Sequence, residues 1–172
     1  MIIHQDDDWL VVDKPTGMAT HAPRPGELGA VEWLALHLGL EAHVVSRLDR
    51  GTSGVLLMAR HAAASAQAQR IPEDGGATQQ YEFLSDRDAQ APSETWVRED
   101  ELDGKPARTE FRRLGREGAL WRYQARITRG RTHQVRRHAA LSGAPVLGDG
   151  EHGGAAWPRL CLHCAEVQWP GI

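Results

Sequence analysis

The 172-residue chain has no long apolar run, and this absence excludes a class of protein. Its longest apolar stretches, such as Val55–Ala59, are far shorter than the roughly 20 residues that a helix needs to cross a bilayer. No basic leader with an apolar core opens the sequence, because Met1–Ile3 runs directly into His4 and an acidic stretch. These features predict a cytoplasmic protein that does not bind membranes.

Cysteine is also scarce, since Cys161 and Cys164 are the only two. Two thiols three residues apart cannot form a disulfide framework for a chain of this size. With Pro158 they resemble half of a zinc-deaminase motif, but none of the nine histidines is part of the His-x-Glu that the motif requires. A structural zinc site built from both thiols and two histidines is an alternative. The favoured interpretation is two half-buried strand residues without a ligand.

The short motifs of several large enzyme classes are missing as well. The chain contains no Gly-x4-Gly-Lys-Ser/Thr, no Gly-x-Gly-x-x-Gly, no Gly-x-Ser-x-Gly and no His-Glu-x-x-His. The sequence therefore does not predict a P-loop nucleotide site, a dinucleotide site, a hydrolase elbow or a zinc-protease helix.

Charge is present, but it is distributed unevenly along the chain. The net charge is −3, yet residues 1–105 hold 9 basic against 18 acidic side chains, and residues 106–172 hold 11 against 5. Eighteen of the 20 basic residues are arginine, which suits bidentate contacts with phosphate. A local basic surface on an acidic protein can bind nucleic acid, although a solvated charged face would give the same counts.

The apolar and charged fractions, 41% and 25%, are those of a globular chain, and its length fits one domain. Apolar spacing predicts helices at 30–40, 61–70 and 132–141, strands at 9–13 and 55–59, a loop at 71–78, and a run of strands over 79–128. Strands dominate the second half, and helices interrupt rather than alternate. This pattern predicts an α+β fold with a mixed, mostly antiparallel sheet flanked by helices.

The first segment that could carry chemistry is Arg47–Gly54. Here the Asp49 carboxylate lies between Arg47 and Arg50, in a loop that leads into a buried strand. Guanidinium groups favour the ionised form, in which an aspartate can act as a nucleophile or a base. A structural ion pair is the alternative, and the spacing alone favours it.

The second segment is 128–138, in which four arginines and two histidines surround a predicted helix start. Free backbone N–H groups at such a start favour anions, so the segment could bind phosphate or a polynucleotide. A solvated basic helix is the alternative. Arg131 and Arg136 are five residues apart and do not share one helix face, so each is expected to have its own partner.

Together, the two segments resemble the RluA family of RNA pseudouridine synthases. Ser46–Gly54 is similar to the family motif His-Arg-Leu-Asp-x-x-Thr-Ser-Gly, and Gly130–His138 is similar to Gly-Arg-Thr-His-Gln-Ile/Leu-Arg-x-His. Three shorter landmarks also match in order: Asp13–Gly17, Pro145–Asp149 and Leu162-His163. The resemblance extends from Ile2 to Pro170, and it implies the pseudouridine synthase fold in one catalytic domain without an S4 RNA-binding domain.

The chain departs from the family pattern in several places. Ser46 replaces the usual histidine, Gln79 replaces the usual lysine two residues before Tyr81, and the segment between Met58 and Tyr81 is short. These departures keep open an RNA-binding relative that no longer catalyses. Residues 148–153 resemble the TruC branch, which acts on tRNA.

The resemblance implies the roles of individual residues. The family isomerises uridine to pseudouridine without a cofactor or metal. Asp49 is expected to be the catalytic carboxylate, Arg136 to pair with it, and Tyr81 to stack on the target uracil. Arg47 is expected to fill the space that the flipped uridine leaves.

The remaining predicted substrate contacts are Arg50, Arg131, His133 and Leu162. Arg131 and His133 are expected to contact phosphates, and Leu162 to wall the pocket, although Leu162 could equally be plain core. The expected partner is RNA, either tRNA or rRNA, and the expected state is a monomer.

Overall fold

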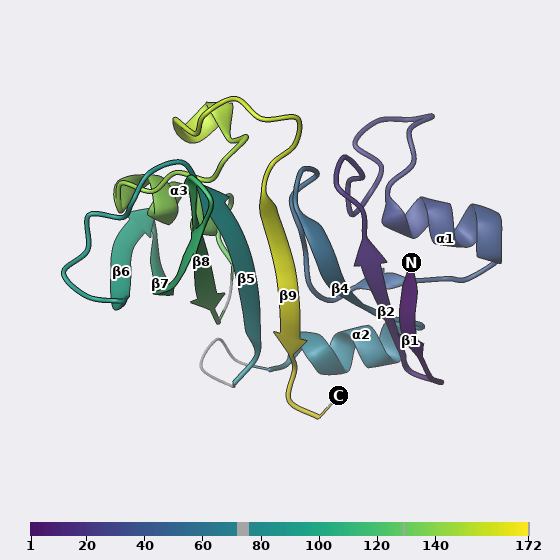
Figure 1. Cartoon of the computed structure of the whole chain (residues 1–172). Coiled ribbons are helices and arrows are strands. Elements are labelled where there is room, and N and C mark those ends of the chain that lie inside the picture. Colours follow the sequence, from purple (N-terminus) through teal and green to yellow (C-terminus); the bar gives the residue numbers. More distant parts are fainter. Residues whose placement is uncertain (72–75, 129, 172) are drawn as a thin grey trace. The chain divides into compact units, whose positions relative to one another are not determined.

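The computed structural model describes residues 1–71, 76–128 and 130–171 (Figure 1). Its internal contacts divide the chain into a first unit, Met1–Ala77 with Glu166–Ile172, and a second unit, Thr78–Ala165. One catalytic domain over 1–172 therefore stays a prediction. The predicted loop residues Pro72 and Gly75, and Arg129 of the basic segment, lie outside the described residues. Among the residues described, no helix combines the length and apolar character needed to cross a membrane.

The strands of the first unit are β1 (Ile2–Gln5), β2 (Trp9–Lys14), β3 (His43–Val44) and β4 (Ser53–Ala59). They run antiparallel in the order β1-β2-β4, and β3 also pairs with β4. The predicted strands at 9–13 and 55–59 are confirmed. Strand β1 was not predicted, because all four of its residues are exposed and give no apolar alternation.

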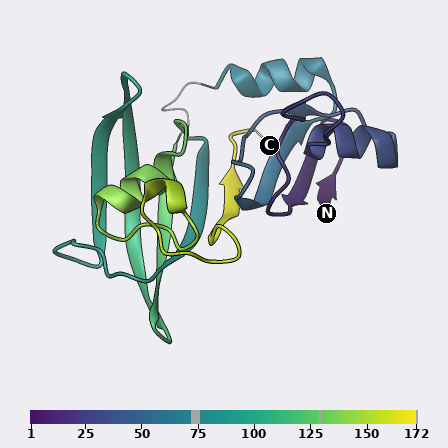
Figure 2. The ribbon, with the colours of Figure 1, turned by 90° about the horizontal axis from the view of Figure 1, so that it is seen from above.

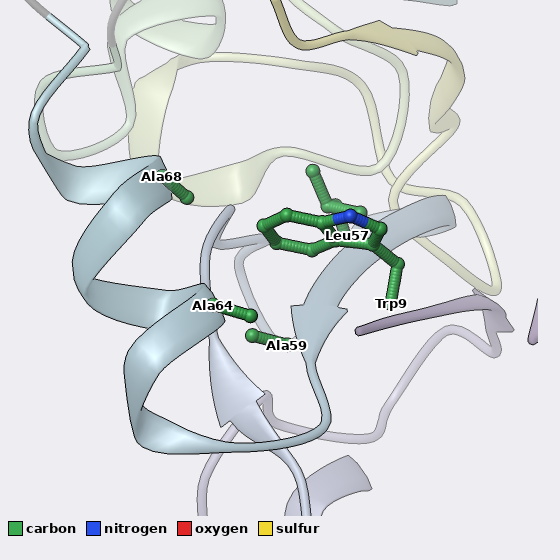
Figure 3. Close-up of a cluster of buried hydrophobic side chains, with 5 residues drawn as sticks. All are labelled: Trp9, Leu57, Ala59, Ala64 and Ala68. Atoms are coloured by element: carbon green, nitrogen blue, oxygen red, sulfur yellow. The ribbon is translucent and has the colours of Figure 1, made fainter. Parts of the chain in front are cut away.

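One face of this sheet is covered by α2 (Ala62–Gln69), which confirms the helix predicted at 61–70. The small side chains of Ala64 and Ala68 lie against Trp9, Leu57 and Ala59, as Figure 3 shows. Alternation sends the next residues of β2 and β4 to the opposite face, where they are also fully buried: Leu10, Val12, Leu56 and Met58. Both faces of this sheet are therefore core.

The helix predicted at 30–40 is α1 (Ala30–Leu38), and Gly39 ends it in the left-handed conformation, at φ 64°. At its start, the Glu32 carboxylate accepts the N–H groups of Gly29 and Ala22 at 3.1 and 2.8 Å. This capping arrangement fixes the loop that precedes the helix.

The second unit contains the predicted run of strands: β5 (Thr78–Ser85), β6 (Thr95–Leu102), β7 (Lys105–Glu117) and β8 (Leu120–Ile127). Their order is β5-β8-β7-β6, and each neighbouring pair is antiparallel. The inner face is aromatic: the Tyr123 ring lies 5.1 Å from that of Phe83, and the Trp96 ring lies 5.1 Å from that of Phe111. These pairings confirm the largely antiparallel α+β prediction.

Helix α3 (Gln134–Leu141) lies against this sheet (Figure 2). The Gln134 amide donates to the Arg108 carbonyl at 2.9 Å and the Thr109 hydroxyl at 3.1 Å, and His138 Nδ1 lies 2.8 Å from the same hydroxyl. The helix begins two residues later than predicted, because His133 is left-handed at φ 52°.

After α3 the chain forms a 3-10 turn, η1 (Gly150–His152), and then β9 (Leu162–Gln168), which begins in the second unit and ends in the first. Pro145–Leu147, which begins the family landmark Pro145–Asp149, is irregular chain and not a strand. It is held by hydrogen bonds from Leu147 N–H to the Leu84 carbonyl and from Cys161 N–H to the Leu147 carbonyl, at 2.7 and 2.8 Å.

Candidate active site

Asp49 lies on the loop Ser46–Thr52, which connects β3 to β4 and is called the Asp49 loop below. Ser46 anchors its start, since its buried hydroxyl oxygen accepts the N–H of Leu57 at 2.9 Å. At its end, the Thr52 N–H donates to the Asp49 carbonyl at 3.0 Å, which closes a tight turn. The serine that replaces the usual histidine of the family is therefore a structural residue tied to β4.

The segment 14–20 holds the middle of the Asp49 loop. The Gly17 N–H donates to the Arg50 carbonyl at 2.8 Å, and the Arg50 guanidinium donates back to the Gly17 carbonyl at 2.9 Å. The Thr16 hydroxyl donates to the Gly51 carbonyl at 2.7 Å. Because each of these bonds involves a backbone group, the segment fixes the path of the loop mainly through the peptide chain.

Thr20 makes the matching contact on the other side of Asp49. Its buried hydroxyl donates to the Leu48 carbonyl at 3.0 Å and lies 3.3 Å from the Leu48 N–H. The Leu48 side chain is itself buried. Both peptide groups of Leu48 are thus satisfied by a single residue, and the backbone that leads into Asp49 is fixed.

Lys14 is fully buried beneath the Asp49 loop. Its ammonium donates to the carbonyl oxygens of Met18, Pro15 and Arg50 at 2.6, 3.0 and 3.4 Å. Burial lowers the pKa of Lys14 to about 8, and the negative charge of Asp49 opposes this lowering. In the sequence Lys14 is only a landmark, because its burial and its charge interaction depend on the fold.

Asp49 is half-buried, while its neighbours Arg47 and Arg50 are exposed. Arg50 donates to Gly17 and lies 3.7 Å from the Glu27 carboxylate, so it helps to hold the loop. Arg47 lies at the surface of the loop, and its contact with a substrate stays a prediction.

Arg136 is the centre of a charged cluster in the second unit, formed with Asp149, Glu151 and His152 and called the Arg136 network below. Its guanidinium donates to both oxygens of the buried Asp149 carboxylate, at 2.7 and 2.8 Å, and to Glu151 at 2.9 Å. His152 lies 3.0 Å from Asp149. The predicted pairing of Arg136 with Asp49 joins residues of the two units and stays a prediction.

The carboxylates of this network are held ionised. Burial alone raises the pKa of Asp149, but its hydrogen bonds with Arg136 and His152 outweigh burial, so that the pKa lies below its usual value. The hydrogen bond from Arg136 likewise lowers the pKa of Glu151. Sequence reasoning matched Asp149 to a family landmark but assigned no role to Asp149, Glu151 or His152. Asp149 and Glu151 pair with Arg136 across 13 and 15 residues, and His152 joins the network only through Asp149.

Two places in the chain carry residue types that could bind a metal ion. Within the part of the chain that the structure describes, one group of three side chains could supply ligands to a metal ion. It consists of His133, Glu151 and His152, whose ligand atoms all lie within 4.8 Å of one another. Glu151 there already accepts a hydrogen bond from Arg136, whose positive charge disfavours a second cation. The cluster is therefore best described as an ion-pair network.

The two cysteines lie elsewhere. Cys164 is fully buried within β9, as the strand interpretation predicted, while Cys161 is half-buried and immediately precedes the strand. Burial raises the pKa of the Cys161 thiol, which keeps it protonated. A structural zinc site needs four ligands, and among the described residues neither cysteine lies in a group of three or more side chains that could hold a metal ion.

The other predicted site residues also belong to the second unit. Tyr81 is buried on β5, and Leu162, the first residue of β9, is buried as well. Arg131 donates through its side chain to the Pro106 carbonyl at 3.2 Å, and His133 Nδ1 lies 3.6 Å from Glu151. The structure thus places Arg131, His133 and Arg136 at the start of α3, while Tyr81 and Leu162 lie on strands of the second unit and the Asp49 loop lies in the first unit.

The family model described as RNA pseudouridylate synthase matches residues 8–141, which includes the Asp49 loop, Tyr81 and Arg136. The chain belongs to the RNA pseudouridylate synthase family. The predicted resemblance to the RluA family is thereby confirmed, and the matched span contains both arginine-rich segments.

Relatives within the family include ribosomal large subunit pseudouridine synthase C from several bacteria. The chain is 29% identical to that of Vibrio cholerae over 98% of this chain and 60% of the relative. It is 32% identical to that of Vibrio vulnificus and 31% identical to that of Escherichia coli, each over 98% of this chain and 61% of the relative. The chain thus spans about three fifths of the length of these relatives.

Solved structures of family members share the fold. Human RNA pseudouridylate synthase domain containing 1 superimposes with a TM-score of 0.80 at 23% identity, over 98% of this chain and 78% of that one. Human RNA pseudouridylate synthase domain containing 4 gives a TM-score of 0.77 at 21% identity, over 99% and 84%. The predicted pseudouridine synthase fold is confirmed.

Proposed function

We propose that the chain is an RNA pseudouridine synthase that isomerises uridine in structured RNA, with Asp49 as its catalytic carboxylate. The observation that carries the proposal is the Asp49 loop. Segment 14–20 fixes the backbone on both sides of Asp49 through hydrogen bonds with Leu48, Arg50 and Gly51, and leaves the carboxylate half-buried. A carboxylate presented on a rigid backbone suits a reaction that depends on one positioned acid.

The reaction that we propose conserves every atom of the base. The N1–C1′ bond of uridine breaks, the base turns, and C5 forms the new bond to C1′. C5 then loses its proton and N1 gains one, so nothing is oxidised or reduced. Asp49 would act either on the sugar or on the base to start bond breaking, and the later proton transfer from C5 requires a base near the ring.

The second unit would supply the other parts of the site. Tyr81 would stack on the uracil, and Arg136 would pair with Asp49. The paired hydrogen bonds between Arg136 and Asp149 support this role, because they fix the guanidinium plane. Arg47 would enter the space left by the flipped nucleotide, and Arg131 and His133 would contact phosphates.

The RNA is proposed to be 23S rRNA or tRNA. The names of the bacterial relatives favour rRNA, and the similarity of residues 148–153 to the TruC branch favours tRNA. We expect the protein to act in the cytoplasm, where both RNAs are found, and as a monomer.

Tritium release tests the proposal directly. Bulk tRNA and rRNA labelled at C5 of uridine are incubated separately with the protein and with Asp49→Asn. We expect release from one pool and none with the variant. Release that persists with Asp49→Asn would remove Asp49 from the mechanism.

An RNA-binding relative that no longer catalyses is the second candidate, and Gln79 is the observation that favours it. RNA binding by the unmodified protein, without tritium release from either pool, would support this candidate.

A further inference from the structure

Gln79 stands in β5 at the position where the family usually has lysine, and the proposed mechanism does not use it. It lies two residues before Tyr81, so both side chains point to the same face of the strand. In the pairing with β8, Gln79 is opposite Ile127 and Tyr81 is opposite Ala125. Gln79 is only 6% exposed, as is Tyr81.

The amide nitrogen of Gln79 is buried and, among the described residues, has no hydrogen-bond partner. Such a group lowers stability, and buried amides nearly always have partners. The other buried nitrogen without a hydrogen bond, His138 Nε2, differs because the Asp100 carboxylate lies 3.7 Å away. Gln79 thus presents two unused N–H donors on the same face as Tyr81.

We propose that the Gln79 side chain donates a hydrogen bond to a carbonyl oxygen of the target uracil, an inference that rests on the proposed function. Two residues along a strand span about 6.5–7 Å. A ring stacked on Tyr81 therefore has an edge within reach of the Gln79 amide. Uracil has an acceptor at position 4, where cytosine has an amino donor, so a hydrogen bond to O4 would also favour uracil over cytosine.

Gln79→Met tests the inference, with Gln80→Met as the matched control. Both substitutions replace the same amide by a side chain of similar length, but Gln80 lies on the opposite face of β5. Each variant is measured by thermal unfolding and by kcat/KM for tritium release from the pool that the unmodified protein uses.

We expect Gln79→Met to raise the unfolding midpoint by about 2–4 °C, because a buried donor without a partner is removed. We expect its kcat/KM to fall about tenfold, the effect of one hydrogen bond worth about 1.4 kcal/mol. Gln80→Met should neither raise the unfolding midpoint nor lower kcat/KM. A residue with a purely structural role would lose stability when replaced, so the opposite signs of the two effects are diagnostic.

A lowered midpoint for Gln79→Met would show that the amide has a partner in the folded protein, and it would overturn the inference. Unchanged kcat/KM in this variant, with Asp49→Asn inactive, would overturn the inference and leave the proposed function intact.

If the unmodified protein releases no tritium, RNA affinity replaces kcat/KM, and equal affinities of the two methionine variants would overturn the inference. Gln79→Lys, which restores a donor, should recover activity relative to Gln79→Met, and an equal loss in both would also count against it.

Discussion

The Asp49 loop and the Arg136 network carry the two residues expected to act together, but they are held in different ways. Backbone groups hold the loop: Gly17, Thr16 and Thr20 bond its peptide groups, and the one buried charge is Lys14. Side chains hold the network, in which Arg136 and Asp149 neutralise each other. A side chain on a loop held by its backbone can be replaced while the loop keeps its conformation. Replacing one member of an ionic network leaves its partners without their counter-charge and lowers the stability of the protein.

The largest effect is expected at Asp49. Asp49→Asn should abolish turnover because the carboxylate performs the chemistry, and should change the free energy of unfolding by less than about 1 kcal/mol because the backbone holds the loop. Tritium release and denaturant unfolding measure the two quantities. A collapse in stability would mean that the Asp49 side chain, rather than the backbone, organises the loop.

Arg136→Ala should behave in the opposite way and lose stability as well as activity. It leaves the buried Asp149 carboxylate without its partner, which lowers the free energy of unfolding by about 3–5 kcal/mol. The double variant Arg136→Met with Asp149→Leu should recover much of this stability while remaining inactive. If the single and double variants are equally stable, the pair is not the source of the effect.

Lys14 gives the loop a dependence on pH. The pKa of Lys14 is about 8 in the folded protein and near 10.5 when the side chain is exposed. Between these pH values Lys14 is mostly deprotonated in the folded protein and mostly protonated in the unfolded chain. The free energy of unfolding should therefore rise with pH between about 8 and 10.5, by up to about 3 kcal/mol relative to Lys14→Met. Activity should fall over the same range, because the neutral amine holds the loop carbonyls less firmly.

Denaturant unfolding of both proteins across this pH range is the measurement. Parallel stability curves for the unmodified protein and Lys14→Met would show that Lys14 does not titrate there.

The smallest effect is expected for Thr20→Val, which keeps the shape of the side chain and removes the hydroxyl. The Leu48 carbonyl loses its donor, so we expect a loss of about 1–2 kcal/mol of stability and a modest decrease in kcat. Urea unfolding and tritium release test this. If the decrease in kcat, converted to an activation free energy, exceeds the loss in the free energy of unfolding, small shifts of the Asp49 backbone matter for turnover.

The fold was largely predictable from local patterns. Short apolar runs next to turn residues identified β2 and β4, partial alternation identified strands of the second unit, and Gly39 marked the end of α1, because each signal lies within a few residues. Strand β1 was not predicted because it has no buried residue and therefore no apolar pattern. Helix α3 begins later than predicted because His133 is left-handed, a conformation that the sequence does not indicate.

Site residues could be predicted from the sequence only where they occupy a position of a family motif. Asp49, Tyr81 and Arg136 follow from family motifs, which place them in the chain but not in space. The roles of Lys14 and Asp149 follow from burial and from contacts with distant residues. Besides its bonds to the nearby Pro15 and Met18, Lys14 donates to the Arg50 carbonyl, 36 residues away, and Arg136 is 13 residues from Asp149. Such pairings depend on tertiary contacts that local patterns do not contain.

The discontinuity of the first unit has a consequence for biosynthesis. Residues 166–172 belong to this unit, and the Trp169 indole donates to the Ala68 carbonyl on α2 at 3.4 Å. On a translating ribosome the N-terminal part emerges first, but its final segment follows only after the whole second unit has been made. The apolar side chains of the first unit that pack with Trp169 therefore stay uncovered until Trp169 itself has been synthesised and has left the ribosome.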